Sequence, residues 1–192
     1  MRLKNRIVFP PIGTRFAGLN GEATQLDVDH YAARAKGGAG LLVVPWVQVE
    51  TKLGRKIGRH RIDSDEHIRG FREVVEAVHL NDAKIAIQLS HPGRAMTADE
   101  AGKEAPISAS ESYCQPFGTT SRPLFIEEID YLVESFASAA IDRSSPKSVT
   151  TAASVLPKSV SYCSSVRSWG CPLGIVFEPV RRRLGTIWQD LA

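Results

Sequence analysis

The 192-residue sequence lacks the features that mark several classes of protein. Its three cysteines, Cys114, Cys163 and Cys171, form no CxxC pair and are odd in number, which argues against a disulfide framework or a cysteine metal site. No apolar run approaches the ~20 residues that a membrane-spanning helix needs. The first residues, MRLKNRIVFP, contain no leader-peptide pattern. We therefore expect a cytoplasmic protein without a membrane partner.

Metal and nucleotide-binding fingerprints are absent as well. The five histidines show no spacing typical of metal ligands, so we predict no metal site. None of the glycine-rich stretches stands in the strand-to-helix context of a dinucleotide-binding motif or a P-loop. No Ser/His/Asp or Cys/His set and no close pair of carboxylates stands out, so the residues by themselves leave the catalytic groups unknown.

The formal net charge of +3 is not spread evenly along the chain. Basic and acidic residues nearly balance in residues 1–143, whereas residues 144–192 hold a basic excess that includes Arg181, Arg182 and Arg183. A nucleic-acid surface is more often built along one face of a folded domain. We therefore expect no nucleic-acid partner.

What is present is an alternation of strand and helix patterns. Apolar runs predict strands, and apolar residues at three- and four-residue spacing predict helices. Asp27 after Thr24, and Glu66 after Asp63, predict capping-box-like helix entries. Pro45 predicts a bend or the end of the second strand, and we expect the strand to stop near Val44 or Pro45. The alternation predicts a parallel sheet with right-handed crossovers. The predicted strands are residues 6–11, 41–44 and 84–88, and the predicted helices are 24–36, 63–78 and 126–143.

Two segments fall outside this alternation. Residues 95–124 are polar and rich in Pro, Gly and Ser, and at that length we expect a functional loop rather than a simple connection. Residues 144–192 are rich in serine, contain four prolines and show no helix-length periodicity. We expect this divergent tail to be disordered or poorly structured.

Polar residues at the ends of apolar strands are the candidates for chemistry. Gln88 ends the third strand, where an unpaired amide costs roughly 1–3 kcal/mol. It therefore either bonds to a neighbouring strand or water, or contacts a ligand. His91 and Arg94 follow in the loop, where the simpler interpretation is a surface or second-sphere histidine and a solvated arginine, and the alternative for Arg94 is an anion clamp. Gly13, after the first strand, either makes a turn or lets the backbone approach a ligand.

Four segments, in this order and spacing, resemble the old yellow enzyme family. They are LKNRIVFPPIGTRFA, HYAARAKGGAGLLVV, SDEHIRGF and KIAIQLSHPGRA, and they are most similar to its NADH:flavin oxidoreductase and dienoyl-CoA reductase branch. The resemblance covers about residues 3–143. It implies an α/β fold, the N-terminal part of a TIM (β/α)₈ barrel, with residues 1–143 as a partial FMN-binding barrel. It also implies hydride transfer from NAD(P)H through FMN to an activated alkene or enone.

The resemblance also assigns roles to individual residues. Gln88 matches a glutamine that bonds the pyrimidine edge of the flavin. Gly13 stands where other members use Thr or Cys to tune the flavin, and offers only its backbone N–H. Trp46 stands where the family usually has Ala or Gly, which let the isoalloxazine approach. Arg15 matches a position that can face the substrate. The residues matched to cofactor binding are Pro10, Pro11, Ile12, Gly13, Trp46 and Gln88.

The chain departs from the family pattern after Ala140. The family continues into an H-x-x-H-G-Y motif that binds the substrate and can supply a proton, and no such motif follows here. The usual first β-hairpin, the phosphate-binding loops and the arginines of later strands are missing too. One hypothesis is that residues 144–192 are the product of a shifted reading frame. Two alternatives to an enzyme of this type are a truncated, non-catalytic partial barrel that self-associates or binds partners through open sheet edges, and a TIM-barrel enzyme with another cofactor.

Overall fold

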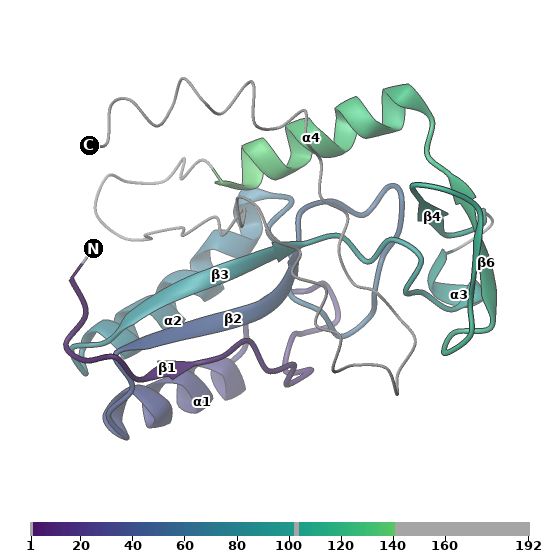
Figure 1. The fold of residues 1–192 in the computed structure, drawn as a ribbon. Helices are drawn as coiled ribbons and strands as arrows, with labels where there is room; N and C mark the ends of the chain where they lie inside the picture. Colours follow the sequence, from purple (N-terminus) through teal and green to yellow (C-terminus); the bar gives the residue numbers. More distant parts are fainter. Residues whose placement is uncertain (1, 102–103, 141–192) are drawn as a thin grey trace.

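A three-stranded parallel sheet forms the centre of the structure, a computed structural model that describes residues 2–101 and 104–140 (Figure 1). The strands are β1 (Val8–Phe9), β2 (Leu41–Gln48) and β3 (Lys84–Ser90), in the order β1-β2-β3. Both pairs are parallel, which confirms the predicted sheet. The predicted divergent tail, residues 144–192, lies outside the described residues.

Strand β2 does not stop at Pro45, so that prediction was wrong. It continues to Gln48 through an irregularity, because its register against β3 shifts between Val44 and Val47. Trp46 within this bulge has φ 48°, an uncommon value for a residue with a side chain. The extra residue changes the side-chain parity, since Leu42, Val44 and Val47 all pack into the same core. A bulge can accommodate a proline that a regular ladder cannot.

Helices α1 (Gln25–Lys36) and α2 (Ile68–His79) follow β1 and β2 and pack on the same face of the sheet (Figure 1). Asp27 Oδ2 accepts a hydrogen bond from the backbone N–H of Thr24 at 2.9 Å, which confirms the predicted entry to α1. The predicted Asp63 cap of α2 was wrong. Ser64 precedes a 3₁₀ turn, Asp65–His67, and Asp63 instead pairs with Arg61 at 2.6 Å.

The core lies between this face of the sheet and the two helices. The apolar stripe predicted for α2 is confirmed, because Phe71, Val74, Val75 and Val78 are buried. The main buried partners are Tyr31 and Ala35 from α1, Leu42, Val44 and Val47 from β2, and Ile85 and Ile87 from β3.

The long segment after β3 has secondary structure of its own, which the sequence patterns did not predict. It contains α3 (Ala98–Ala101) and a second sheet with β6 (Thr119–Pro123) between β4 (Ile107–Ser108) and β5 (Ser112–Cys114). Helix α4 (Ile126–Ala140) then returns past β3 (Figure 1). Among the described residues, no helix is long and apolar enough to cross a membrane.

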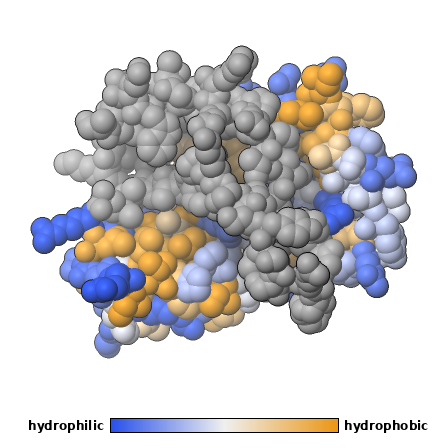
Figure 2. All heavy atoms as spheres, in the orientation of Figure 1, coloured by the Kyte–Doolittle hydropathy of each residue, from blue (hydrophilic) through white to orange (hydrophobic). Residues whose placement is uncertain are grey.

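Several apolar side chains of β1, β2 and the residue before β1 are partly exposed. Figure 2 has the orientation of Figure 1, and it shows hydrophobic residues (orange) gathered in the region where Figure 1 places β1 and β2. Ile7 is 57% exposed and Val8 is 47% exposed at the edge of the sheet. Leu41 and Val43 of β2 are only half-buried, although the run LLVVPWVQV predicts burial on both faces.

Candidate functional site

The carboxyl ends of the three parallel strands bring residues 13, 46 and 88 together. The backbone N–H of Trp46 donates a hydrogen bond to Oε1 of Gln88 over 3.2 Å. Cζ3 of the Trp46 indole lies 2.4 Å from the position that a Cβ on Gly13 would occupy. Any larger residue at position 13 would therefore collide with the indole. The carboxyl end of a parallel sheet is the place where α/β folds bind ligands.

The bulge in β2 explains how Trp46 reaches this position. Without the extra residue, the strict alternation of a strand would aim residues 44 and 46 to the same side, into the core under α1 and α2. The register shift after Val44 instead leaves Val47 in the core, and the indole lies against Gly13. The tertiary structure thus places the tryptophan beside the glutamine that the sequence analysis singled out.

Arg59, which the sequence analysis did not select, completes this cluster. Its guanidinium carbon lies 3.9 Å from the centroid of the Trp46 ring, a cation–π geometry. Its Nη1 is 3.0 Å from the Cβ position of Gly13. Arg15 is close enough that its charge, together with burial as the larger cause, lowers the pKa of Arg59. The sequence did not indicate this cluster of one indole and two guanidiniums. Arg59 lies in a loop, where no periodic pattern shows which residues it will meet.

The remaining predicted site residues line the same end of the sheet but are more open to solvent. Pro10 is exposed, Pro11 is half-buried and Ile12 is 51% exposed. Arg15 is exposed and has φ 60°, an uncommon value for a residue with a side chain. The structure therefore brings Gly13, Trp46 and Gln88 into contact and leaves Pro10 and Ile12 as an exposed rim.

His91 is not a surface residue, so that half of the simpler interpretation was wrong, and a second-sphere position stays a prediction. Its Nε2 lies 2.5 Å from Oε1 of Glu50, and the side chains are 5% and 2% exposed. The angles do not suit an aligned hydrogen bond, so the pair is a close electrostatic contact. Nδ1 of His91 accepts a hydrogen bond from the backbone N–H of Gly93 at 3.0 Å, and Nε2 is the ring nitrogen that faces Glu50. The contact ties the loop after β3 to the end of β2.

Other polar contacts hold the surrounding loops. His60 Nε2 contacts Oδ2 of Asp27 at 2.9 Å, which joins the loop before α2 to the first turn of α1. Arg94 is half-buried and donates to Oγ of Ser112 at 3.1 Å, so it is not the solvated side chain expected from the sequence. Lys56 pairs with Glu100 at 3.0 Å. The strand ends are thus supported by loops that are bonded to one another.

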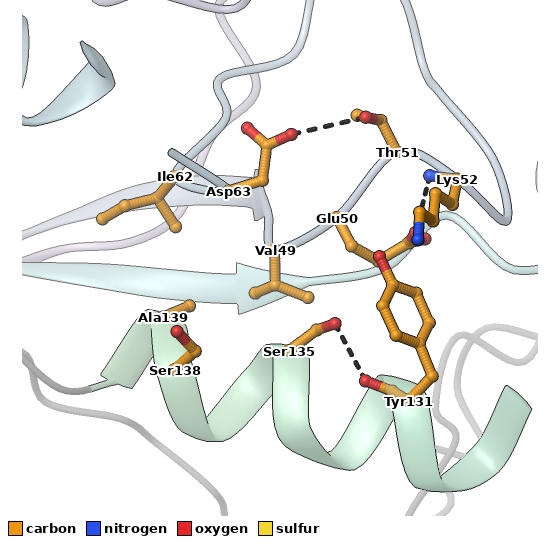
Figure 3. A pocket seen from close by; sticks show the side chains of 10 residues that line it. All are labelled: Val49, Glu50, Thr51, Lys52, Ile62, Asp63, Tyr131, Ser135, Ser138 and Ala139. Carbon is orange, nitrogen blue, oxygen red and sulfur yellow. Dashed lines mark hydrogen bonds between the residues drawn. The ribbon is translucent and has the colours of Figure 1, made fainter. Parts of the chain in front are cut away.

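A cavity of about 320 Å³ lies elsewhere, between α4 and the segment that follows β2 (Figure 3). Tyr131 and Ser135 point into it from α4, toward Glu50 (Figure 3). Burial raises the pKa of Tyr131, and the charges of Glu50 and Asp63 act in the same direction. None of the seven predicted site residues lines this cavity. We place the candidate site at the strand ends instead, because the predicted contact residues converge there.

The strand-end cluster fits a flavin at one edge and conflicts with it at the ring face. Oε1 of Gln88 is used by Trp46, but within residues 2–101 and 104–140 its amide nitrogen has no hydrogen-bond partner and can donate to a pyrimidine carbonyl. The space beside Gly13, however, is filled by the Trp46 indole, with Arg59 stacked on it. A planar ring can lie there only if the indole moves.

Comparisons with known proteins agree with the fold. The model of the NADH:flavin oxidoreductase / NADH oxidase family matches residues 1–145. An NADH oxidase of Thermoanaerobacter brockii is 39% identical over 140 residues, which are 72% of this chain and 22% of that protein. An NADPH dehydrogenase of Halalkalibacterium halodurans is 34% identical over 142 residues, 72% of this chain and 40% of that protein. Both relatives are thus much longer than the matched segment.

Solved structures show the same partial correspondence. An old yellow enzyme from a Pichia species superposes with a TM-score of 0.63 at 26% identity, covering 72% of this chain and 38% of that one. Morphinone reductase gives a TM-score of 0.61 at 25% identity, covering 72% of this chain and 42% of that one. The described part therefore corresponds to less than half of these barrels.

Proposed function

This chain belongs to the NADH:flavin oxidoreductase / NADH oxidase family, and we propose that residues 1–143 form the first part of the barrel of an FMN-dependent ene-reductase. The family's cofactor is FMN, with NADH or NADPH as the reductant. When bound, FMN passes a hydride from the nicotinamide to the β-carbon of an activated alkene. The observation that carries the proposal is the convergence of Gly13, Trp46 and Gln88 at the carboxyl ends of three parallel strands.

We assign the residues of this cluster as follows. The amide nitrogen of Gln88 would donate to the pyrimidine edge of FMN, and the backbone of residues 10–13 would lie along the ring. Trp46 would border the ring site once its indole has moved away from Gly13, and Arg15 would face the small-molecule alkene or enone. Because no described residue is a clear proton donor to the substrate, we assign no catalytic acid. A reaction that draws on NADH or NADPH is consistent with a cytoplasmic location.

The first test is flavin binding by the purified chain. We expect a yellow protein whose flavin absorbance is bleached by NADH or NADPH without oxygen. Gln88→Ala should weaken FMN binding about tenfold, because one hydrogen bond is worth roughly 1–1.5 kcal/mol. Gln25→Ala is the matched control, since Gln25 is exposed on α1 and bonds only to Asp29 among the described residues. Equal FMN affinity in the two variants would contradict the role of Gln88.

Trp46→Ala tests the conflict at the ring face. Removing the indole opens the space beside Gly13, so we expect FMN to bind about tenfold more tightly to this variant than to the wild type. Fluorescence quenching of FMN during titration measures both affinities. If Trp46→Ala instead weakens FMN binding, the indole supports the flavin in place and need not move.

A second candidate function is that of a non-catalytic partial barrel. The observation that favours it is the open sheet. A barrel closes over eight strands, whereas the described residues contribute three, with β1 and β3 at the edges. Exposed strand edges favour pairing with other chains, and self-association is its expected consequence. Sedimentation velocity of the flavin-free chain separates the two functions. A colourless protein that stays colourless with excess FMN and sediments as oligomers supports this second function.

A further inference from the structure

Arg15 and Arg59 form a pair of cations beside Gly13 at the carboxyl end of the sheet. Arg59 is half-buried, with its guanidinium carbon 3.9 Å from the centroid of the Trp46 ring and its Nη1 3.0 Å from the Cβ position of Gly13. Cβ of Arg15 lies 4.0 Å from the Cβ position of Gly58, the neighbour of Arg59. The φ of 60° at Arg15 is a conformation that costs energy for a residue with a side chain. Arg15 therefore lies close to the segment that carries Arg59.

Neither arginine has a counterion among residues 2–101 and 104–140. No ion pair or hydrogen bond joins Arg15 or Arg59 to a described carboxylate. The nearby Glu100 raises the pKa of Arg59 by its charge, but its carboxylate is bonded to Lys56 at 3.0 Å. Two other half-buried arginines do have a carboxylate partner, since Arg61 pairs with Asp63 and Arg122 with Glu128, both at 2.6 Å.

Two guanidiniums without a carboxylate partner among the described residues are suited to an oxyanion. The fork of an arginine matches the two oxygens of a carboxylate, and the guanidinium carbon of Arg59 lies 3.9 Å from the centroid of the Trp46 ring. A bound anion would also relieve the repulsion between the two cations. The apolar indole beside them can pack against the carbon chain of a small ligand.

We propose that Arg15 and Arg59, positioned by Trp46 and Gly13, form a subsite for the carboxylate of an α,β-unsaturated acid. This deepens the proposed function, on which it rests, by naming the chemical class of the alkene. The carboxylate would activate the double bond and anchor it next to the predicted flavin contacts. A phosphate, as carried by a nucleotide, is the other source of an oxyanion, and the experiment includes it as a separate arm.

The experiment uses Trp46 as its own reporter. Replacing Trp169 and Trp188 by Phe leaves Trp46 as the single tryptophan of the full chain. Its fluorescence is followed while the flavin-free protein is titrated with crotonate, with the uncharged crotonamide, or with inorganic phosphate. We expect saturable binding of crotonate at least tenfold tighter than binding of crotonamide or phosphate. Phosphate that binds more tightly than crotonate overturns the carboxylate assignment.

Variants connect the binding to the two arginines. Arg59→Ala and Arg15→Ala should each weaken crotonate at least tenfold, and Arg59→Lys should recover part of the affinity by restoring the charge. Arg69→Ala is the matched control, because the side chain of Arg69 is 92% exposed. The substitution removes only its contact with Glu73, in which the two side chains are 3.9 Å apart. Calorimetric titration repeats each measurement, since loss of Arg59 alters the fluorescence of Trp46 directly. Circular dichroism checks folding, and Arg59→Lys remains the test if Arg59→Ala does not fold.

The outcomes are separable from those of the proposed function. Equal affinities for crotonate and crotonamide, or an equal loss of affinity in Arg69→Ala, overturn the subsite even when the chain binds FMN. Tight crotonate binding by a chain that never binds FMN supports the subsite and contradicts the ene-reductase proposal. Each measurement is made without flavin, so failure of the cofactor to bind does not affect it.

Discussion

Helices α2 and α4 carry similar apolar stripes but have different surroundings. In α2 the side chains of Phe71, Val74, Val75 and Val78 are all buried against the sheet and α1. In α4 only Leu132 of the predicted stripe is buried, whereas Ile129 and Phe136 stay half-buried. The amphipathic pattern of a helix determines which of its faces turns toward the core. That face is buried only where another element of the fold packs against it. In a closed barrel, a further strand beside β3 would supply that neighbour.

The seam under α4 is also more polar than the seam under α2. Tyr131, Ser135 and Ser138 face the cavity of Figure 3, together with Glu50 and Asp63 from the segments flanking β2 and α2. The α2 seam is lined by aliphatic and aromatic side chains. We therefore expect α2 to be held by apolar burial, and α4 in part by charge and hydrogen bonds that depend on pH.

The largest expected effect comes from truncating the α2 core. Phe71→Ala should lower the free energy of unfolding by about 3–5 kcal/mol, because it leaves a cavity where the ring is 3% exposed. Phe136→Ala on α4 is the matched control and should cost about 1 kcal/mol, since its ring is half-buried and loses less contact. Urea unfolding followed by circular dichroism measures both. Equal losses would contradict the contrast between the helices.

Leu132→Ala should have the next largest effect. Leu132 is the one described residue of α4 that is fully buried, so we expect a loss of about 2–3 kcal/mol. Ile129→Ala, one turn earlier and half-buried, should cost about half as much. Hydrogen exchange sharpens the result, because Leu132→Ala should speed exchange in α4 more than in α2. Uniform acceleration over both helices would show that they unfold together.

Glu50→Gln tests the polar seam. Burial by itself raises the pKa of Glu50, but the contacts with His91 and the backbone N–H groups of Leu53 and Lys52 outweigh it and hold the pKa below its ordinary value of 4.5. A carboxylate whose pKa is lowered on folding stabilises the protein above its ordinary pKa, and this stability is lost as the pH falls through the folded-state pKa.

The expected result has two parts. At pH 7 the Glu50→Gln variant should lose about 1–3 kcal/mol of unfolding free energy, because a buried charged contact is replaced by a neutral one. Below pH 4.5 the wild type should lose stability more steeply than the variant. Urea midpoints measured between pH 3 and pH 7 give both quantities. Parallel curves for the two proteins would contradict a lowered pKa at Glu50.

The smallest effect is expected at an exposed pair on α2. Arg69 and Glu73 are 3.9 Å apart, with side chains 92% and 57% exposed. Arg69→Ala should change the free energy of unfolding by less than about 0.5 kcal/mol, because solvent screens such pairs. The same urea titration serves as the measurement. A loss above 1 kcal/mol would mean that the outer face of α2 has a partner.

The sequence by itself determined the order of elements and the parallel sheet. Strand and helix periods, the Thr24–Asp27 entry and the α2 stripe depend on neighbours within a few residues, and these local rules held. The four segments that resemble the family were also recognisable from the sequence, because their residues occur in the family's order and spacing. Gln88 was a candidate on position alone.

Only the tertiary structure decided how the site is arranged. Pro45 argued for the end of a strand, but pairing with β3 carried β2 through a bulge that aims Trp46 at Gly13. His91 and Glu50 lie 41 residues apart in the chain, and no local pattern predicts that they meet. The same holds for Arg59 on Trp46. Local spacing fixes which elements form, whereas contacts between loops depend on how three strands bring their ends together in space.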